Sequence, residues 1–306
     1  MVMKKSFSTV VLIIIFTCLA QFKIQAQIIK IDTVTKWKKN FKSAVNLNQA
    51  SFSSNWKSGG VNSLGFTTLL NYKANYKSDG RSWDNEIDLL YGMVKNAGQG
   101  YRKTLDRLFL DTKVGRNLGK HWDLYLSFNF QTQFAPGYKY STDANGASVA
   151  SRISSFLAPG FFTTAVGFEY APKPHFKMRL SPFAPRLTFV KNPENYTAVD
   201  PEKPYGVKLG EMIRYEWLSS QVQFEYNRDV MTNVNLKLRY LIFSNYENFN
   251  LKNTDQRMDI NVTAKVNKYI NASISSILLY DRDQDEKLQL SQAFSLGFLY
   301  TFKNFK

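Results

Sequence analysis

The sequence predicts an all-β fold, a single antiparallel transmembrane β-barrel of about twelve strands. Residues 121–134 read HWDLYLSFNFQTQF, and because strand side chains point alternately to opposite faces, this stretch has one apolar and one polar face. Comparable stretches recur along the chain with no segment of helical period to cover their apolar faces. The connections between them alternate between short and mostly longer. A closed barrel with lipid outside and water inside accounts for all three observations.

The first element, residues 1–26, is predicted to be a cleaved signal peptide. Two lysines precede an apolar run over 10–20 that is too short to span a bilayer, and small residues up to Ala26 suit a cleavage site. The alternative is lipidation at Cys18, although Thr17 stands where a lipoprotein signal prefers a smaller residue. Cleavage after Ala26 would leave a chain without a thiol, which excludes disulfides and thiolate metal sites.

A short periplasmic arm is predicted over 27–40 and the outer-membrane barrel over 41–306. An even number of strands closes an antiparallel barrel with both termini on one side. Pro182 and Pro185 lie within one predicted strand, where proline removes ladder hydrogen bonds, so we expect a bulge or bend there. The predicted strands are 41–56, 61–77, 82–96, 104–117, 121–134, 155–170, 175–191, 212–228, 232–247, 256–267, 269–281 and 288–302.

The connections give the predicted barrel a direction, with short periplasmic turns and longer extracellular loops. The first connection, 56–60, is short although it falls on the side of the long loops. The short set is 78–81, 117–120, 171–174, 228–232 and 267–268. The longer set is 96–103, 135–152, 192–211, 247–255 and 281–287.

Charge and aromatic content indicate the partners. The formal net charge is +16, and loss of the three lysines of the signal peptide would leave +13, yet no nucleic-acid recognition motif or basic helix appears. We therefore expect the lipid bilayer and lipopolysaccharide phosphates as partners, and no nucleic acid. Aromatic residues make up 15% of the chain, which suits the aromatic girdles of a barrel. The alternating aromatic residues of 288–302 are typical of the insertion signal read by the barrel-assembly machinery.

Nine blocks of the sequence resemble, in order, an outer-membrane β-barrel family of Gram-negative bacteria that is catalogued as domain of unknown function 3078. The resemblance covers about 41–302. It implies the fold and the cell outer membrane as the location, and because the family has no assigned activity it implies no catalytic residue. The blocks are NWKSGGVNSLGF (55–66), WDNEIDLLYGMVKN (83–96), KTLDRLFLDTKVG (103–115), FQTQFAPGY (130–138), ISSFLAPG (153–160), SPFAPRLTFVKN (181–192), FSNYENF (243–249), KVNKYI (265–270) and YDRDQD (280–285).

The two histidines argue against an enzyme. His121 and His175 fall at predicted periplasmic strand ends, and Ser127, the nearest serine downstream of His121, lies too far along its strand for a base to activate it. The sequence contains no HExxH, GxSxG or phosphate-binding glycine loop. We expect no catalytic residues and no cofactor, with the histidines as interfacial anchors.

Ten charged side chains are predicted to point into the lumen. They are either a salt-bridge network that fills the barrel and joins its strands, or a charged constriction that selects solutes. A barrel of about twelve strands lies between packed and open barrels, so both interpretations remain. The ten are Asp84, Glu86, Asp88, Arg107, Asp111, Lys113, Lys237, Arg239, Asp259 and Lys265.

Two loop features are weaker candidates. Asp281, Asp283 and Asp285 place oxygen ligands at alternate positions, which suits Ca²⁺, but the glycine and the distal glutamate of a calcium loop are missing. A solvated acidic loop, or divalent cations bridging to lipopolysaccharide, are the alternatives. In the two longest loops, tyrosines could stack on sugar rings. These are Tyr138, Tyr140 and Tyr196.

The expected function is therefore that of an exported outer-membrane barrel that is either structural or a narrow pore for small solutes. The alternative is a module that binds a surface ligand or a protein partner through its long extracellular loops. A soluble β-sandwich is the competing fold, but its strands usually run to only about 5 or 6 residues.

Overall fold

A computed structural model describes residues 36–53, 61–146, 148–247, 249–250, 253–267 and 269–304. The predicted signal peptide, most of the predicted arm and the first connection lie outside the described residues. Among the described residues, no helix is long and apolar enough to cross a membrane.

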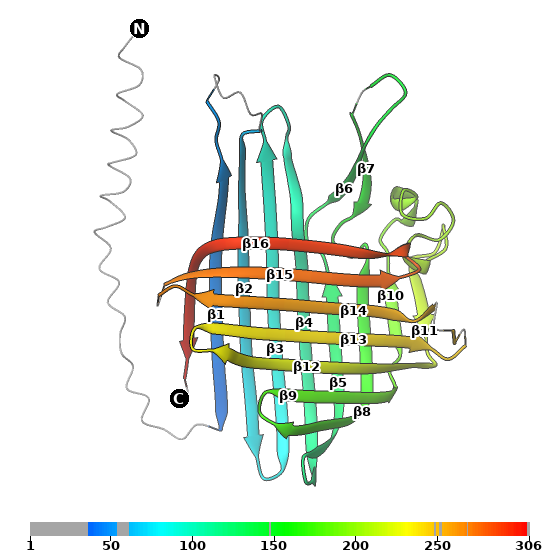
Figure 1. Cartoon of the computed structure of the whole chain (residues 1–306). Helices are drawn as coiled ribbons and strands as arrows, with labels where there is room; N and C mark the ends of the chain where they lie inside the picture. The colour runs from blue at the N-terminus through cyan, green and yellow to red at the C-terminus, as the bar shows by residue number, and fades with distance from the viewer. Residues whose placement is uncertain are drawn as a thin grey trace. The chain divides into compact units, whose positions relative to one another are not determined.

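Twelve strand positions close into one antiparallel ring. Around it run β1, β2, β3, β4, β5, β8, β9, β12, β13, β14, β15 and β16, and β16 pairs with β1 (Figure 1). This confirms the predicted fold class. The ring strands are β1 (Trp37–Ala50), β2 (Ser63–Ser78), β3 (Arg81–Asn96), β4 (Tyr101–Gly119), β5 (Trp122–Thr132), β8 (Gly160–Lys173), β9 (Phe176–Phe183), β12 (Ser219–Met231), β13 (Val234–Asn245), β14 (Asp255–Lys265), β15 (Ile270–Asp281) and β16 (Asp285–Lys303).

Two positions of the ring hold broken strands. β9 is followed by β10 (Arg186–Phe189), and β12 is preceded by β11 (Ile213–Glu216). β10 pairs with β8 and with β11, so each short strand continues its longer neighbour in the wall. The break between β9 and β10 falls at residues 184 and 185, the place where the prolines predict a bend. There the N–H of Ala184 donates to the carbonyl oxygen of Ser219 at 2.7 Å, and the carbonyl oxygen of Pro185 accepts from the N–H of Thr164 on β8 at 3.1 Å.

The first strand begins earlier than the sequence suggests. Pairing starts at Trp37, opposite Tyr76, whereas the predicted arm reached residue 40. The indole ring of Trp37 lies 5.2 Å from the ring of Tyr76 and 5.6 Å from that of Trp83, measured between centroids. These aromatic contacts explain why the strand extends into the lysine-rich segment.

The two ends of the barrel differ, and we call them the turn end and the loop end. At the turn end, Asp79 and Gly80 form a two-residue hairpin turn with φ of 51° and 72°, the left-handed geometry that such hairpins require. At the loop end, the predicted long connection 96–103 is shorter than expected because β4 begins at Tyr101. The connection 281–287 is likewise reduced because β16 begins at Asp285.

The remaining loop-end connections carry structure that the sequence does not predict. Residues 135–152 contain most of a hairpin of β6 (Gly137–Thr142) and β7 (Ser148–Ser154). Residues 192–211 contain two short 3-10 helices, η1 (Pro193–Tyr196) and η2 (Pro204–Gly206). Residues 192–211 supply three members of a small buried apolar cluster, which Ala158 and Val190 complete. Its buried members are Ala158, Val190, Tyr196, Tyr205 and Val207.

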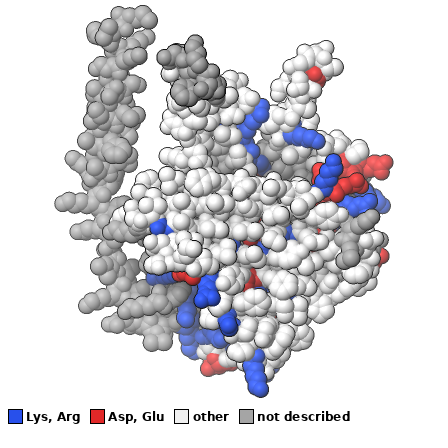
Figure 2. Space-filling view, viewed as in Figure 1, with Lys and Arg blue, Asp and Glu red and all other residues white. Residues whose placement is uncertain are grey.

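The barrel wall has an apolar outer face and a polar inner face. On β5, Leu124, Leu126 and Phe128 are exposed on the outside, whereas Tyr125 and Ser127 are buried inside. Within the part of the chain that the structure describes, no second layer covers the exposed apolar side chains, so a lipid surround is the environment that stabilises them. In one face of the molecule, charged side chains gather towards the ends, with a band of mostly other residues between them (Figure 2).

Candidate functional site

The lumen is crossed by ion pairs between opposite walls. Alternation on β3 sends Glu86 and Asp88 inward, while Trp83 and Ile87 are exposed outside. Glu86 on β3 accepts a hydrogen bond from Arg239 on β13, with Nη2 to Oε2 at 2.9 Å. These two strands stand six places apart in the twelve-strand ring and therefore face each other.

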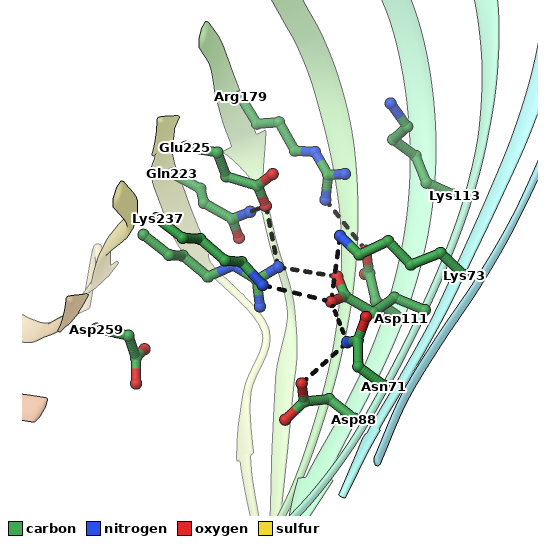
Figure 3. A network of polar contacts seen from close by, with 12 residues as sticks. Asn71, Lys73, Asp88, Asp111, Lys113, Arg179, Gln223, Glu225, Lys237 and Asp259 are labelled. Atoms are coloured by element: carbon green, nitrogen blue, oxygen red, sulfur yellow. Dashed lines mark hydrogen bonds and ion pairs between the residues drawn. The ribbon is translucent and has the colours of Figure 1, made fainter. Parts of the chain in front are cut away.

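Glu86 is the hub of this crossing. Its carboxylate also lies 3.2 Å from the Nζ of Lys73 and 3.7 Å from that of Lys237, and it accepts a 2.8 Å hydrogen bond from Asn71. Figure 3 shows Lys237 and Glu225 reaching from one wall towards Lys73 and Asn71 on the other. A buried carboxylate is stable only when such partners replace its water, and Glu86 has four.

A second crossing runs through Arg107 on β4. Its Nη2 lies 2.5 Å from Asp88, and its Nη1 lies 3.4 Å from Asp259 on β14, again six places away in the ring. Asp259 is also held by Arg257 at 2.9 Å. Arg107 therefore ties the walls together close to the Glu86 crossing.

A further group of charges lies along one wall. Lys113, only 1% exposed, places its Nζ 2.6 Å from Glu169 and 3.1 Å from Asp84. Arg179 donates from Nε to Glu169 at 2.9 Å and lies 3.3 Å from Asp111. These contacts join β3, β4, β8 and β9 without crossing the lumen.

We call all these ion-paired residues the central charge network. Seven cations face seven carboxylates, so the network as a whole carries no net charge and has no built-in preference for anions or cations. The cations are Lys73, Arg107, Lys113, Arg179, Lys237, Arg239 and Arg257, and the carboxylates are Asp84, Glu86, Asp88, Asp111, Glu169, Glu225 and Asp259.

Nine of the ten predicted lumen charges belong to this network, and Lys265 does not. Lys265 is exposed at the turn-end terminus of β14. Sequence reasoning missed Lys73, Glu169, Arg179, Glu225 and Arg257. The available signal was strand parity, because each stands on the same face of its strand as other polar residues.

A chamber of about 670 Å³ lies between the network and the loop end. Arg107, Arg239 and Asp259 contribute to its lining on the network side. Residues of the β6–β7 hairpin and of 192–211 contribute on the loop side, Tyr138 and Tyr205 among them. We call it the loop-end chamber. Its volume is within the range of small-molecule sites.

The loop tyrosines divide into two kinds. Tyr138 and Tyr140 are partly exposed, and the guanidinium of Arg102 lies 4.0 Å from the ring centroid of Tyr140. Tyr196 is only 2% exposed, and its hydroxyl lies 2.5 Å from that of Ser155. The expectation that Tyr196 could stack on a ligand is therefore wrong, because the apolar cluster at the rim covers its ring.

The three aspartates of the acidic loop do not converge. Asp281 is buried and accepts a 2.6 Å hydrogen bond from Gln284, Asp283 pairs with Arg214, and Asp285 accepts from the N–H of Lys287 at 2.8 Å. Among the described residues, no group of three or more histidine, cysteine, aspartate or glutamate side chains could hold a metal ion. The weak calcium prediction at this loop thus finds no support in the geometry.

The two histidines pack against tyrosines at the turn end. The ring of His121 lies 6.5 Å from that of Tyr170, and the ring of His175 lies 5.6 Å from that of Tyr226, both edge to face. These contacts fit an anchoring role.

A closed antiparallel ring with an apolar exterior and a charged interior defines a transmembrane β-barrel of the outer-membrane type. Residues 47–138 match the family described as "Protein of unknown function (DUF3078)", which confirms the resemblance over that stretch. A search of curated proteins gives no match.

Solved outer-membrane barrels resemble the chain over most of its length. The translocator domain of autotransporter NalP from Neisseria meningitidis is 8% identical with a TM-score of 0.41, covering 89% of this chain and 90% of that one. The COG4313 outer membrane channel from Pseudomonas putida F1 is 10% identical with a TM-score of 0.38, covering 87% and 94%. The NanC porin is 7% identical with a TM-score of 0.39, covering 85% and 98%. At these identities and TM-scores, nothing about the transported molecules of those proteins applies to this chain. The assignment of the fold is based on the strand pairing itself.

Proposed function

We propose that this outer-membrane barrel is a narrow pore for small solutes whose passage is blocked at rest by the central charge network. The observation that carries the proposal is the pair of ion-pair crossings, Glu86 to Arg239 and Arg107 to Asp259, between strands that face each other across the ring. A passage through the lumen has to part these contacts. The proposal includes export by the predicted signal peptide, with the loop end facing the exterior and the turn end the periplasm.

The neutrality of the network decides what kind of pore is expected. A ring of one sign would select ions of the other sign. Seven cations against seven carboxylates instead favour mutual pairing, so the network acts as a plug rather than as a charge filter. We propose no catalytic role.

Single-channel conductance in planar bilayers tests the pore. The opening variant neutralises both crossings at once with Glu86→Gln, Arg239→Gln, Arg107→Gln and Asp259→Asn. The control, Lys113→Met with Glu169→Gln, removes one ion pair of the wall group, which does not cross the lumen.

We expect rare small steps for the native chain and for the control, and larger, more frequent steps for the opening variant. Heat-modifiable gel migration checks that each variant is folded. Silence of a folded opening variant in several salts would leave a structural barrel and end the pore proposal.

A surface-binding role is the second candidate, and the β6–β7 hairpin favours it. Tyr138 and Tyr140 stand partly exposed on this hairpin, each with a guanidinium over its ring, from Arg152 at 6.0 Å and Arg102 at 4.0 Å. Replacing residues 140–150 by Asn-Gly keeps the pairing of Lys139 with Ser151 and removes the tip. Loss of binding to lipopolysaccharide vesicles with unchanged folding would support this role, and unchanged binding would exclude the tip.

A further inference from the structure

Four residues that line the loop-end chamber each carry a buried hydrogen-bond donor without a partner. Seven buried side-chain atoms of the described residues have no hydrogen-bond partner. The four donors, the Nε of Arg107, Arg186 and Arg239 and the Nε2 of Gln289, all belong to residues that line the chamber. The three acceptors, on Asn40, Asn46 and Asn271, belong to residues outside its lining.

We infer that the chamber is a binding site for a small organic carboxylate that carries an apolar group, such as an arylalkanoate. Buried donors cost free energy unless an acceptor meets them. An ionised carboxylate supplies acceptors alone, and its hydrogen bonds to guanidinium are charge-assisted. A sugar brings as many donors as acceptors, and a cation would meet the arginines directly.

Arg186 is the best-placed anchor. Its side chain is 10% exposed, and its guanidinium carbon lies 3.2 Å from the ring centroid of Phe243 and 5.7 Å from that of Phe161. Nη1 lies 2.6 Å from Asp255, which fixes the group in its plane and leaves Nε without a partner. A guanidinium held in this way loses little freedom when a ligand oxygen arrives.

The walls of the chamber account for the apolar group. Apolar side chains from several strands of the ring line it between the arginines and the loops. They include Leu90, Phe109, Phe161, Leu241, Phe243 and Leu279. Most acidic residues of the lining already have cationic partners: Asp106 pairs with Lys103, Asp255 with Arg186, and Asp259 with Arg107.

The carboxylate site does not depend on conduction, because a ligand can occupy the chamber without passing the network. Equilibrium dialysis of the full-length protein in detergent against radiolabelled phenylacetate measures it directly. Radiolabelled 2-phenylethanol is the neutral counterpart of similar shape, and empty micelles correct for partition. We expect saturable binding of phenylacetate at one site, with 2-phenylethanol at least tenfold weaker.

Two variants test the location of the site. Arg186→Gln with Asp255→Asn removes the anchor together with its partner, so no buried charge is left alone. The control, Arg282→Gln with Glu286→Gln, removes an exposed pair of an arginine and a carboxylate. Leu241→Trp places a larger apolar side chain in the chamber and removes no charge. We expect at least tenfold weaker binding for the anchor variant, weaker binding for Leu241→Trp, and no change for the control.

Several outcomes would overturn the carboxylate site: no saturable binding to the native protein, equal binding of 2-phenylethanol, or full binding by a folded Leu241→Trp. If the anchor variant fails to fold, the binding of phenylacetate to Leu241→Trp and the binding of 2-phenylethanol to the native protein still test the site. The pore proposal is tested separately, by the conductance measurements, and its failure would leave the carboxylate site untouched.

Discussion

The central charge network and the loop-end chamber share the same strands, yet one is filled and the other is hollow. In the network, cations and carboxylates from facing walls are close enough to pair, as Glu86 and Arg239 do at 2.9 Å. In the chamber, much of what faces inward is apolar, so side chains such as Leu90 and Leu241 leave space. Strand alternation alone thus decides which side chains face inward. The lumen is closed only where long charged side chains on opposite walls meet.

Burial sharpens the contrast. Six charged side chains of the network are buried, Glu86 and Lys113 among them. The Nε atoms of Arg107 and Arg239, which belong to both the network and the chamber lining, have no hydrogen-bond partner, and Arg186 and Gln289 add two such donors in the chamber alone. The ion pairs of the network hold the barrel strands together, whereas the chamber has free volume in which a ligand could bind. Four variants test this difference, in order of decreasing effect.

Removing the hub should cost most. Glu86→Gln leaves Lys73, Lys237 and Arg239 short of a buried counter-charge, so we expect about 3–5 kcal/mol less stability. Urea unfolding in lipid vesicles, followed by gel migration, measures the change. The exposed Glu286→Gln serves as the control and should behave as the native chain does. A loss for Glu86→Gln no greater than that of the control would contradict a cohesive network.

Removing both partners of a buried pair should cost less than removing one. Lys113→Met alone leaves Glu169 with Arg179 as its remaining cation. Lys113→Met with Glu169→Gln removes both charges of the pair and leaves Arg179 with Asp111, and Asp84 loses Lys113 in both variants. We expect a coupling free energy of about 2 kcal/mol in a double-mutant cycle of unfolding. Strict additivity would mean that the pair contributes nothing specific.

A chamber substitution should disturb stability less than removal of the hub. Phe243→Leu removes the ring beneath the Arg186 guanidinium, and a desolvated contact of this kind is worth about 2 kcal/mol. The same unfolding measurement applies. A cost equal to that of Glu86→Gln would show that the chamber is as cohesive as the network.

The smallest effect is expected in the loops, at Tyr205. Its hydroxyl donates to the carbonyl oxygen of Ile153, and Tyr205→Phe should cost about 1 kcal/mol of local stability. Burial raises the pKa of Tyr205 above its usual value of 10 because the neutral form is favoured in the fold. The stability that this group adds is therefore present below pH 10 and is lost as pH rises above it. Hydrogen exchange across 192–211 should report both changes, and in Tyr205→Phe the pH dependence should be weaker.

The sequence predicts the strands of the barrel wall better than it predicts the side-chain contacts inside the lumen. Alternation over 84–88 is enough to send Asp84, Glu86 and Asp88 inward, because the period of a strand is two. It does not say that Glu86 meets Arg239, since that contact depends on how many strands close the ring and on their stagger. The burial of Tyr196 depends in the same way on packing between loops, which no local pattern encodes.

The seam between β1 and β16 has a consequence for the order of assembly. It joins residues 40–46 of the first ring strand to residues 303–297 of the last ring strand. Every other pair of neighbours in the ring consists of ring strands that follow each other along the chain. Closing so long a loop is entropically the most demanding pairing in the molecule. The ring cannot be completed before β16 is available, so the sheet can grow by local hairpins but closes only when its last strand reaches β1.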